Sequence, residues 1–214
     1  GFEVKLNYPN YTGRKDETLN SVGDLVVPIG TTVDWVFNAE NTDDIEISFL
    51  RENERMPIKR FSDDLFTYKK RAMQDDVYKL FVSNEALPNA DSISYGLTII
   101  PDLYPEITVE SFKDSTDEKV VFFVGDASDD YGMKSISFNY RIGQNGGQSE
   151  GKLETTLLQE PSNKQASYDY IFDLNQLELK PGDEVNYYFE VFDNDAVNGS
   201  KSARTNVMVF AMPT

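Results

Sequence analysis

The sequence contains neither cysteine nor histidine, and these two absences remove most of the common catalytic and metal-binding chemistry. Without cysteine there is no disulfide framework, no thiolate nucleophile and no thiolate ligand for zinc. Without histidine there is no Ser-His-Asp or Cys-His arrangement, and no imidazole to transfer protons near neutral pH. An enzyme built from this chain would depend on carboxylates, tyrosine, lysine or arginine.

Basic residues are scarce as well. The 20 Lys and Arg stand against 37 Asp and Glu, so the formal net charge is -17 at pH 7. A surface of this sign repels phosphate backbones and anionic lipid, which argues against binding to nucleic acid or to a membrane surface. Solubility in water explains the excess charge, and recruitment of cations or of a basic partner is the alternative.

Long apolar stretches are also missing. The sequence has no run of about 18 apolar residues, and its N-terminus lacks the charged and apolar regions of a signal peptide. Because the chain enters a strand pattern directly at Gly1, we expect a segment cut from a longer protein whose targeting and membrane segments lie elsewhere. We therefore expect no direct membrane insertion by this part.

Aromatic residues in alternating patterns are what the sequence has in abundance. The chain contains 12 Tyr and 14 Phe. Many follow period-two alternation, as do Tyr78, Leu80 and Val82, and clusters of Asp, Asn, Gly and Pro separate the alternating stretches. No helical periodicity of useful length is evident, and a strand is favoured even at 62–73, where a short helix could compete. The pattern predicts an all-β fold.

The chain also consists of two similar halves, offset by roughly 90 residues, which suits a repeated sandwich domain. The segments that we match are 32–37 with 119–124, 45–49 with 133–138, 77–82 with 168–172, and 93–99 with 185–192. We expect two tandem immunoglobulin-like β-sandwich domains. The first is immunoglobulin-like and covers residues 1–102, and the second is immunoglobulin-like or fibronectin III-like and covers 103–214. The stretch 100–106 between them contains two prolines and is expected to be short and stiff.

Acidic loops are the strongest candidate site. In an immunoglobulin-like topology, the loops that contain residues 126–130 and 193–195 lie at the same end of the second sandwich, near the linker residue Asp102. Calcium takes roughly six to eight oxygen ligands in flexible geometry, which such loops can supply. The simpler interpretation is that these side chains accept backbone N–H groups in Asx turns, with Gly132 and Gly199 at positive φ. We thus expect no cofactor or, as the alternative, calcium on the candidate ligands Asp126, Asp129, Asp130, Asp193 and Asp195.

Catalysis by the same carboxylates would require a cleft around two suitably spaced acids. Sandwich domains of about 100 residues rarely provide such a cleft, so we predict no enzymatic activity and no catalytic residue. Among the aromatic residues, Trp35 is expected in a core. Four others lie near turns or the linker, where we expect them to be exposed or to pack between domains: Tyr8, Tyr11, Tyr104 and Tyr131.

Four stretches of the sequence resemble a known family, and the resemblance bears on where in the cell the protein lies. The stretches 8–13, 23–35, 129–132 and 193–199 resemble the extracytoplasmic region of a large uncharacterised envelope-protein family of Bacteroidetes, and the resemblance covers nearly the whole chain. It implies membrane helices before this segment and a long charged helical region after it. The segment would then lie in the periplasm or outside the cell, as the soluble part of a membrane-anchored protein. The family has no established activity that the resemblance could carry over.

The sequence therefore predicts a non-catalytic structural spacer and protein-interaction module of a larger cell-envelope protein. Its partner would be another protein or other domains of the same chain. One alternative is a pair of carbohydrate-binding modules, which the richness in aromatic residues favours. The other is a pair of calcium-stabilised adhesion domains, which the acidic loops favour.

Overall fold

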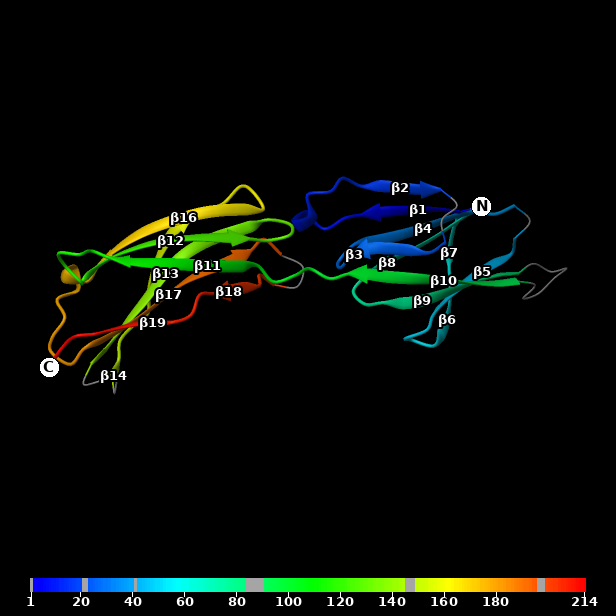
Figure 1. The fold of residues 1–214 in the computed structure, drawn as a ribbon. Coiled ribbons are helices and arrows are strands. Elements are labelled where there is room, and N and C mark those ends of the chain that lie inside the picture. The colour runs from blue at the N-terminus through cyan, green and yellow to red at the C-terminus, as the bar shows by residue number, and fades with distance from the viewer. Residues whose placement is uncertain (1, 21–22, 41, 84–90, 145–148, 196–198) are drawn as a thin grey trace. The chain divides into compact units, whose positions relative to one another are not determined.

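The computed structural model describes residues 2–20, 23–40, 42–83, 91–144, 149–195 and 199–214. The chain divides into two compact units, Gly1–Asp102 and Leu103–Thr214, and each has its own hydrophobic core. Strands make up nearly all of the regular structure, and short 3-10 turns occur only at Asn10–Thr12 and Leu174–Leu177 within the described ranges (Figure 1). The predicted all-β class is confirmed.

Two five-stranded sheets enclose the core of the N-terminal unit. The first sheet has the order β2 (Glu17–Asn20), β1 (Phe2–Asn7), β4 (Thr32–Asn38), β8 (Leu65–Arg71) and β7 (Lys59–Ser62). The second has the order β3 (Leu25–Pro28), β10 (Asp91–Ile100), β9 (Asp76–Ser83), β5 (Asp44–Phe49) and β6 (Glu54–Pro57). Strand β3 runs parallel to β10, whereas the other neighbouring strands are antiparallel.

Alternation along β4 explains how this core forms. Val33, Trp35 and Phe37 point inward and are buried, while the residues between them lie nearer to solvent. The indole of Trp35 is fully buried. The centroid of its ring lies 5.1 Å from the centroid of the Tyr78 ring on the facing sheet. The expectation that Trp35 lies in a core is confirmed.

The second unit repeats this arrangement with a smaller first sheet. That sheet has the order β11 (Glu106–Lys113), β12 (Val120–Ser128) and β16 (Gln165–Asp173). The facing sheet is built around β13 (Met133–Gln144) and β17 (Glu184–Asp193). Strands β14 (Ser149–Glu150) and β15 (Glu154–Gln159) pair with β13, while β18 (Ser202–Arg204) and β19 (Met208–Ala211) pair with β17. In the core between the sheets, the ring of Phe189 lies 5.1 Å from that of Phe123 and 5.0 Å from that of Phe138.

Strand pairing shows that the two units share one topology, and it corrects part of the sequence match. Strand β4 pairs with β8 as β12 pairs with β16, and β5 pairs with β9 as β13 pairs with β17. The match of 32–37 and 45–49 with 119–124 and 133–138 is therefore correct. The match of 77–82 with 168–172 is wrong, because β9 corresponds to β17 and β16 corresponds to β8. The match of 93–99 with 185–192 is wrong for the same reason, since 93–99 lies in β10 and 185–192 lies in β17. All four strands are apolar stretches that contain aromatic residues, so the pattern alone does not identify the sheet to which each belongs.

The tyrosines near turns divide into two groups. Tyr8 is 7% exposed and belongs to the first core, and its hydroxyl donates to the Glu17 carboxylate at 2.7 Å. Tyr11 is 3% exposed and donates to the carbonyl oxygen of Ile29 at 2.6 Å. The expectation of exposure is wrong for these two. Each hydroxyl has a hydrogen-bond partner, which offsets the free-energy cost of burying it. That expectation is correct for Tyr104, which is 69% exposed.

Candidate functional site

The two predicted acidic loops lie side by side at one end of the second unit. The first connects β12 to β13, and the second connects β17 to β18. Met133 at the start of β13 stands opposite Asp193 at the end of β17. Beyond this pair, the Asn194 amide donates to the carbonyl oxygen of Tyr131 at 3.5 Å. Residues 196–198 of the second loop lie outside the described part of the chain.

Asp129 organises the first loop. Its Oδ2 accepts the backbone N–H groups of Tyr131 and Gly132, both at 3.1 Å, and Gly132 has a φ of 126°. The side chain is 7% exposed, and its Oδ1 is buried without a hydrogen-bond partner among the described atoms. Burial raises the pKa of Asp129 to about 6, and the nearby carboxylates of Asp130 and Asp193 add to the shift while the two N–H groups oppose it.

The second loop contains a buried charge cluster. Asp193 and Asp195 are both fully buried, and the Lys201 ammonium lies 2.9 Å from Oδ2 of Asp195 and 3.8 Å from Oδ2 of Asp193. Oδ1 of Asp193 accepts the backbone N–H groups of Asp195 at 3.1 Å and Lys201 at 2.9 Å. Asp129 and Asp193 therefore make the Asx-type hydrogen bonds that the sequence suggests, and Gly132 and Gly199 both have positive φ.

Asp126 and Asp130, the remaining candidate ligands, differ in position. Oδ2 of Asp130 accepts the Leu103 N–H at 3.4 Å, and carboxylate oxygens of Asp129 and Asp130 lie within 4.8 Å of each other. Asp126 is exposed on β12, where it accepts the Ser167 hydroxyl at 2.7 Å. The structure therefore brings Asp129, Asp130, Asp193 and Asp195 to the loop end of the unit and leaves Asp126 on the outer surface of a sheet. Whether a cation binds there stays a prediction.

A second feature is the outer face of the three-stranded sheet, meaning the side chains of β11, β12 and β16 that point away from the core. Register and alternation define this outer face: Glu106, Thr108, Glu110, Phe112, Val120, Phe122, Val124, Asp126, Ser128, Gln165, Ser167, Asp169, Ile171 and Asp173. Five of these fourteen residues are Asp or Glu, and none is Lys or Arg.

An exposed apolar row crosses this face. Phe122 stands directly opposite Phe112 on one side and Ile171 on the other, and these three side chains are 38%, 53% and 59% exposed. In the next row, Val124 is 45% exposed and stands between Glu110 and Asp169. Side chains opposite one another on adjacent strands are in contact range, so apolar surface and carboxylates form one continuous patch.

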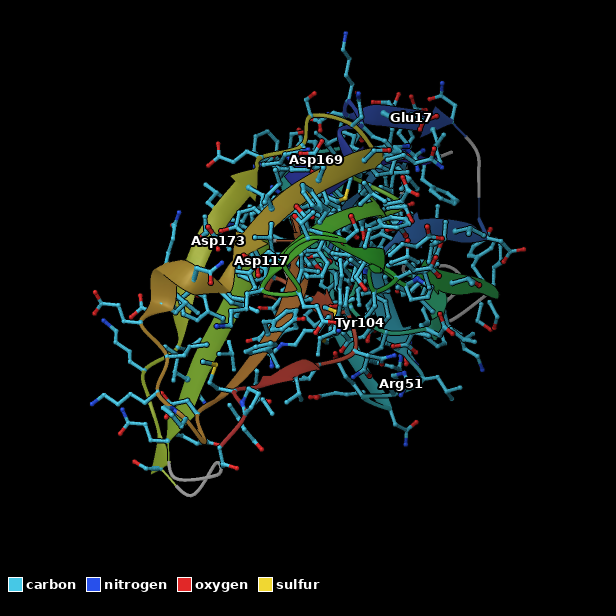
Figure 2. All side chains as sticks on the ribbon, turned by 60° about the vertical axis from the view of Figure 1, so that its left-hand side comes forward. Glu17, Arg51, Tyr104, Asp117, Asp169 and Asp173 are labelled. Carbon is cyan, nitrogen blue, oxygen red and sulfur yellow. The ribbon has the colours of Figure 1, made fainter. Side chains whose placement is uncertain are left out.

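Carboxylates also border the two ends of the patch. Figure 2 shows Asp169 and Asp173 along the ribbon of β16, with Asp117 near Asp173. The Asn175 amide bridges Asp117 and Asp173, since it donates to Oδ2 of Asp117 at 2.7 Å and to Oδ1 of Asp173 at 3.0 Å. At the other end, a shallow depression of about 360 Å³ is lined by the polar side chains Glu106, Thr108, Asp126, Ser128, Gln165 and Ser167.

The sequence carried a signal for this face that alternation alone does not reveal. Residues 120–124 read Val-Val-Phe-Phe-Val, an unbroken apolar run. In a half-buried strand every second residue is normally polar, so a continuous run indicates apolar side chains on both faces. Val121 and Phe123 supply the core, which leaves Phe122 and Val124 on the outside.

Comparisons with known proteins give limited information. No protein-family model matches the chain, and no curated protein matches it. Among solved structures, a marsupial T cell receptor is 11% identical with a TM-score of 0.40, and the alignment covers 99% of this chain and 73% of the receptor chain. A "putative carbohydrate binding protein" from Bacteroides uniformis is 13% identical, with a TM-score of 0.32 and coverages of 83% and 91%. Fibronectin(III)-like modules of Clostridium thermocellum CbhA are 11% identical, with a TM-score of 0.31 and coverages of 90% and 91%.

Identities and TM-scores this low carry no information about function. The resemblance to a Bacteroidetes envelope-protein family stays a prediction. Within the described ranges, no helix has the length and hydropathy needed to cross a membrane.

Proposed function

We propose that this chain is a non-catalytic β-sandwich module that holds other parts of a larger protein in place and binds a protein partner through the outer face of β11, β12 and β16. The partner segment would carry apolar side chains next to lysine or arginine. The observation that supports this proposal is the exposed row of Phe112, Phe122 and Ile171 with carboxylates on both sides.

Burial of the apolar row supplies the favourable free energy. Exposed apolar surface with a polar border is typical of protein-interaction sites, and removing it from water contributes about 25 cal/mol per Å² of apolar area. Three neighbouring side chains that are each between 38% and 59% exposed offer a continuous surface for this purpose. Aromatic residues at the centre of such surfaces commonly contribute most to affinity.

Charge selects the partner. The five carboxylates of the outer face have no Lys or Arg among the other residues of that face to neutralise them. A partner with basic residues would be attracted and oriented, whereas acidic segments, nucleic acid and anionic lipid would be repelled. The non-enzymatic role is consistent with the chain's lack of histidine and cysteine. We place the module outside the cytoplasmic membrane as part of an envelope protein, a proposal that rests on the sequence resemblance.

Two short peptides test the binding proposal. One alternates lysine with valine and the other alternates glutamate with valine, so they match in length and apolar content. Fluorescence anisotropy of each labelled peptide, titrated with the full chain, is expected to show binding of the basic peptide only. High salt is expected to weaken that binding, because it screens the attraction between the charges.

Variants locate the binding surface. Phe122→Ser and Asp169→Lys are each expected to weaken binding of the basic peptide about tenfold. Val26→Ser is the matched control, since Val26 is 64% exposed on a strand of the other unit. Equal binding of both peptides, or unchanged affinity in Phe122→Ser, would refute the proposed surface. Specific retention on a polysaccharide gel, lost in Phe122→Ser, would instead identify a carbohydrate-binding module.

A further inference from the structure

The N-terminal unit carries a basic segment within an otherwise acidic chain. Residues 51–71 contain seven Lys or Arg and four Asp or Glu, whereas the whole chain has a formal net charge of -17 at pH 7. This segment supplies β7 and β8 of the first sheet. Strand β7 lies at the end of that sheet, where it pairs with β8. The chain therefore offers a basic surface on one unit and the acidic outer face of β11, β12 and β16 on the other.

Cationic side chains gather on the outward face of β7 and β8. Lys59 stands opposite Thr67, and Lys69 and Arg71 follow Thr67 along β8 at a spacing of two, so alternation turns all three cations toward the same face. All three are exposed. Among the described ion pairs none includes any of them, and the carboxylate directly opposite them in the sheet is that of Asp34, across from Lys69. Their charges therefore remain available to a partner.

Phe61 adds an apolar side chain to these cations. It lies in β7 and is 75% exposed, and it falls at the shift in register between Arg60 and Ser62. A residue at such an irregularity is left without a partner on the neighbouring strand. Lysine on an edge strand commonly prevents pairing with other chains, but an exposed phenylalanine does not serve that purpose. We use the name basic edge for this set of exposed side chains: Lys59, Phe61, Lys69 and Arg71.

We propose that the basic edge of one copy of this chain binds the outer face of β11, β12 and β16 of a second copy. This inference rests on the function proposed above, because it identifies the partner segment with apolar and basic side chains that the outer face requires. Phe61 packs on the exposed apolar row of that face, and the three cations meet its five carboxylates. The apolar contact supplies affinity, and the opposite charges orient the two surfaces.

The difference between the two surfaces determines how copies assemble. Because each copy carries both surfaces and they are not alike, the contact is heterologous, and each copy binds one neighbour through each surface. Heterologous contacts produce linear chains or closed rings of copies, not symmetric dimers. Since the contact joins separate molecules, self-association increases with protein concentration, and since it depends on charge, it decreases in high salt.

Sedimentation velocity of the full chain over a range of concentrations tests the inference. Species larger than a monomer are expected at high protein concentration in low salt, and they are expected to dissociate in high salt. Phe61→Ser and Lys69→Glu on the basic edge, and Phe122→Ser and Asp169→Lys on the outer face, are each expected to weaken self-association about tenfold. Val26→Ser is the matched control, since Val26 is 64% exposed on β3 of the other sheet, and it is expected to self-associate as the unaltered chain does.

A mixture of two variants tests whether the two surfaces bind each other. Lys69→Glu keeps the outer face intact and Asp169→Lys keeps the basic edge intact, so each alone is expected to self-associate weakly. An equimolar mixture is expected to form dimers that do not extend, because each dimer joins the one intact surface of each variant.

A chain that stays monomeric at every concentration, or a mixture that forms no dimer, would overturn the inference. Larger species that persist undiminished in Phe61→Ser and Lys69→Glu would overturn it as well. If the monomeric chain still binds the basic peptide, the function proposed for the outer face stands without a second copy as the partner. If it binds neither the peptide nor another copy, both proposals are wrong.

Discussion

The ammonium of Lys201 lies 2.9 Å from Oδ2 of Asp195, and the two side chains are only 16% and 0% exposed. The same ammonium lies 3.8 Å from the buried carboxylate of Asp193. Buried charges are costly to leave without a partner, so the second unit depends on this lysine to accommodate both carboxylates.

Lys201→Met therefore tests a structural role. Removing the ammonium takes its positive charge away from the buried carboxylates of Asp193 and Asp195. The second unit is therefore expected to lose roughly 3 kcal/mol of stability. Urea unfolding, monitored by hydrogen exchange at individual backbone amides, measures the change in the free energy of unfolding of each unit. Trp35, the only tryptophan, lies in the first core, and its fluorescence is expected to report an unchanged transition there. Lys152→Met is the control, since Lys152 is exposed.

Gly125→Ala tests a close approach between strands. A Cβ at Gly125 would stand 2.1 Å from the Thr108 carbonyl oxygen and 2.4 Å from the ring of Tyr168, which covers the glycine. Since the oxygen belongs to the backbone of β11, the strand itself would have to move. We expect a loss of about 2 kcal/mol or more, measured by urea unfolding of the second unit.

Gly96→Ala is the matched control for that prediction. Gly96 also lies within a strand, but a Cβ there would meet only an Asp24 oxygen at 3.7 Å. Alanine costs less conformational entropy than glycine on folding, so this variant is expected to be neutral or more stable by up to about 1 kcal/mol. A similar loss in both variants would show that the close contact with Thr108 is not the cause.

Asp129 predicts a pH dependence of the stability of the second unit. Its pKa is raised to about 6, so the folded unit prefers the protonated carboxyl. The stability that this group contributes is fully present below its ordinary pKa of 3.8 and is lost as the pH rises through 6. Asp129→Asn is therefore expected to be more stable than the unaltered chain at pH 7 by roughly 1 to 3 kcal/mol, and the gain should shrink toward pH 4. A gain that does not vary with pH would contradict this account.

Tyr78 predicts an alkaline transition in the first unit. Burial raises its pKa to about 12, and its hydroxyl donates to the carbonyl oxygen of Gly23. The protonated phenol is the form that the fold prefers, so this contribution is present below pH 10 and is lost as the pH rises through 12. Tyr78→Phe is expected to cost about 1 kcal/mol at pH 7, and this difference should shrink as the pH rises from 10 toward 12. Trp35 fluorescence follows the transition, because the two rings lie 5.1 Å apart.

Sequence alone predicted the strands well, because the alternation that creates them is local. Val33, Trp35 and Phe37 are spaced by two, and that spacing determines which face of β4 is buried. Which strands pair is a long-range property, so alternation could not distinguish β16 from a counterpart of β9. The two acidic loops were located because immunoglobulin-like topology fixes the end of the sandwich at which they meet.

The details of the site depended on side-chain direction. Asp126 stands only three residues before Asp129, yet it faces the outer surface because it still belongs to β12. Lys201 could not be assigned from spacing, since nothing in the sequence distinguishes a buried lysine from an exposed one. Tyr8 was expected to be exposed or to pack between domains because it precedes a turn, whereas its hydroxyl pairs with Glu17 and its ring joins the core of the first unit.

The parallel pairing of β3 with β10 bears on the order in which the newly synthesised chain folds. The Gly96 N–H donates to the carboxylate of Asp24 at 2.7 Å, across a separation of 72 residues, and Ile29 donates to the carbonyl oxygen of Ile100 at 2.9 Å. On the ribosome, β3 therefore has no partner until the last strand of its unit has emerged. A nascent chain that stalls before β10 would leave the edges of β3 and β9 open to pairing with a neighbouring chain.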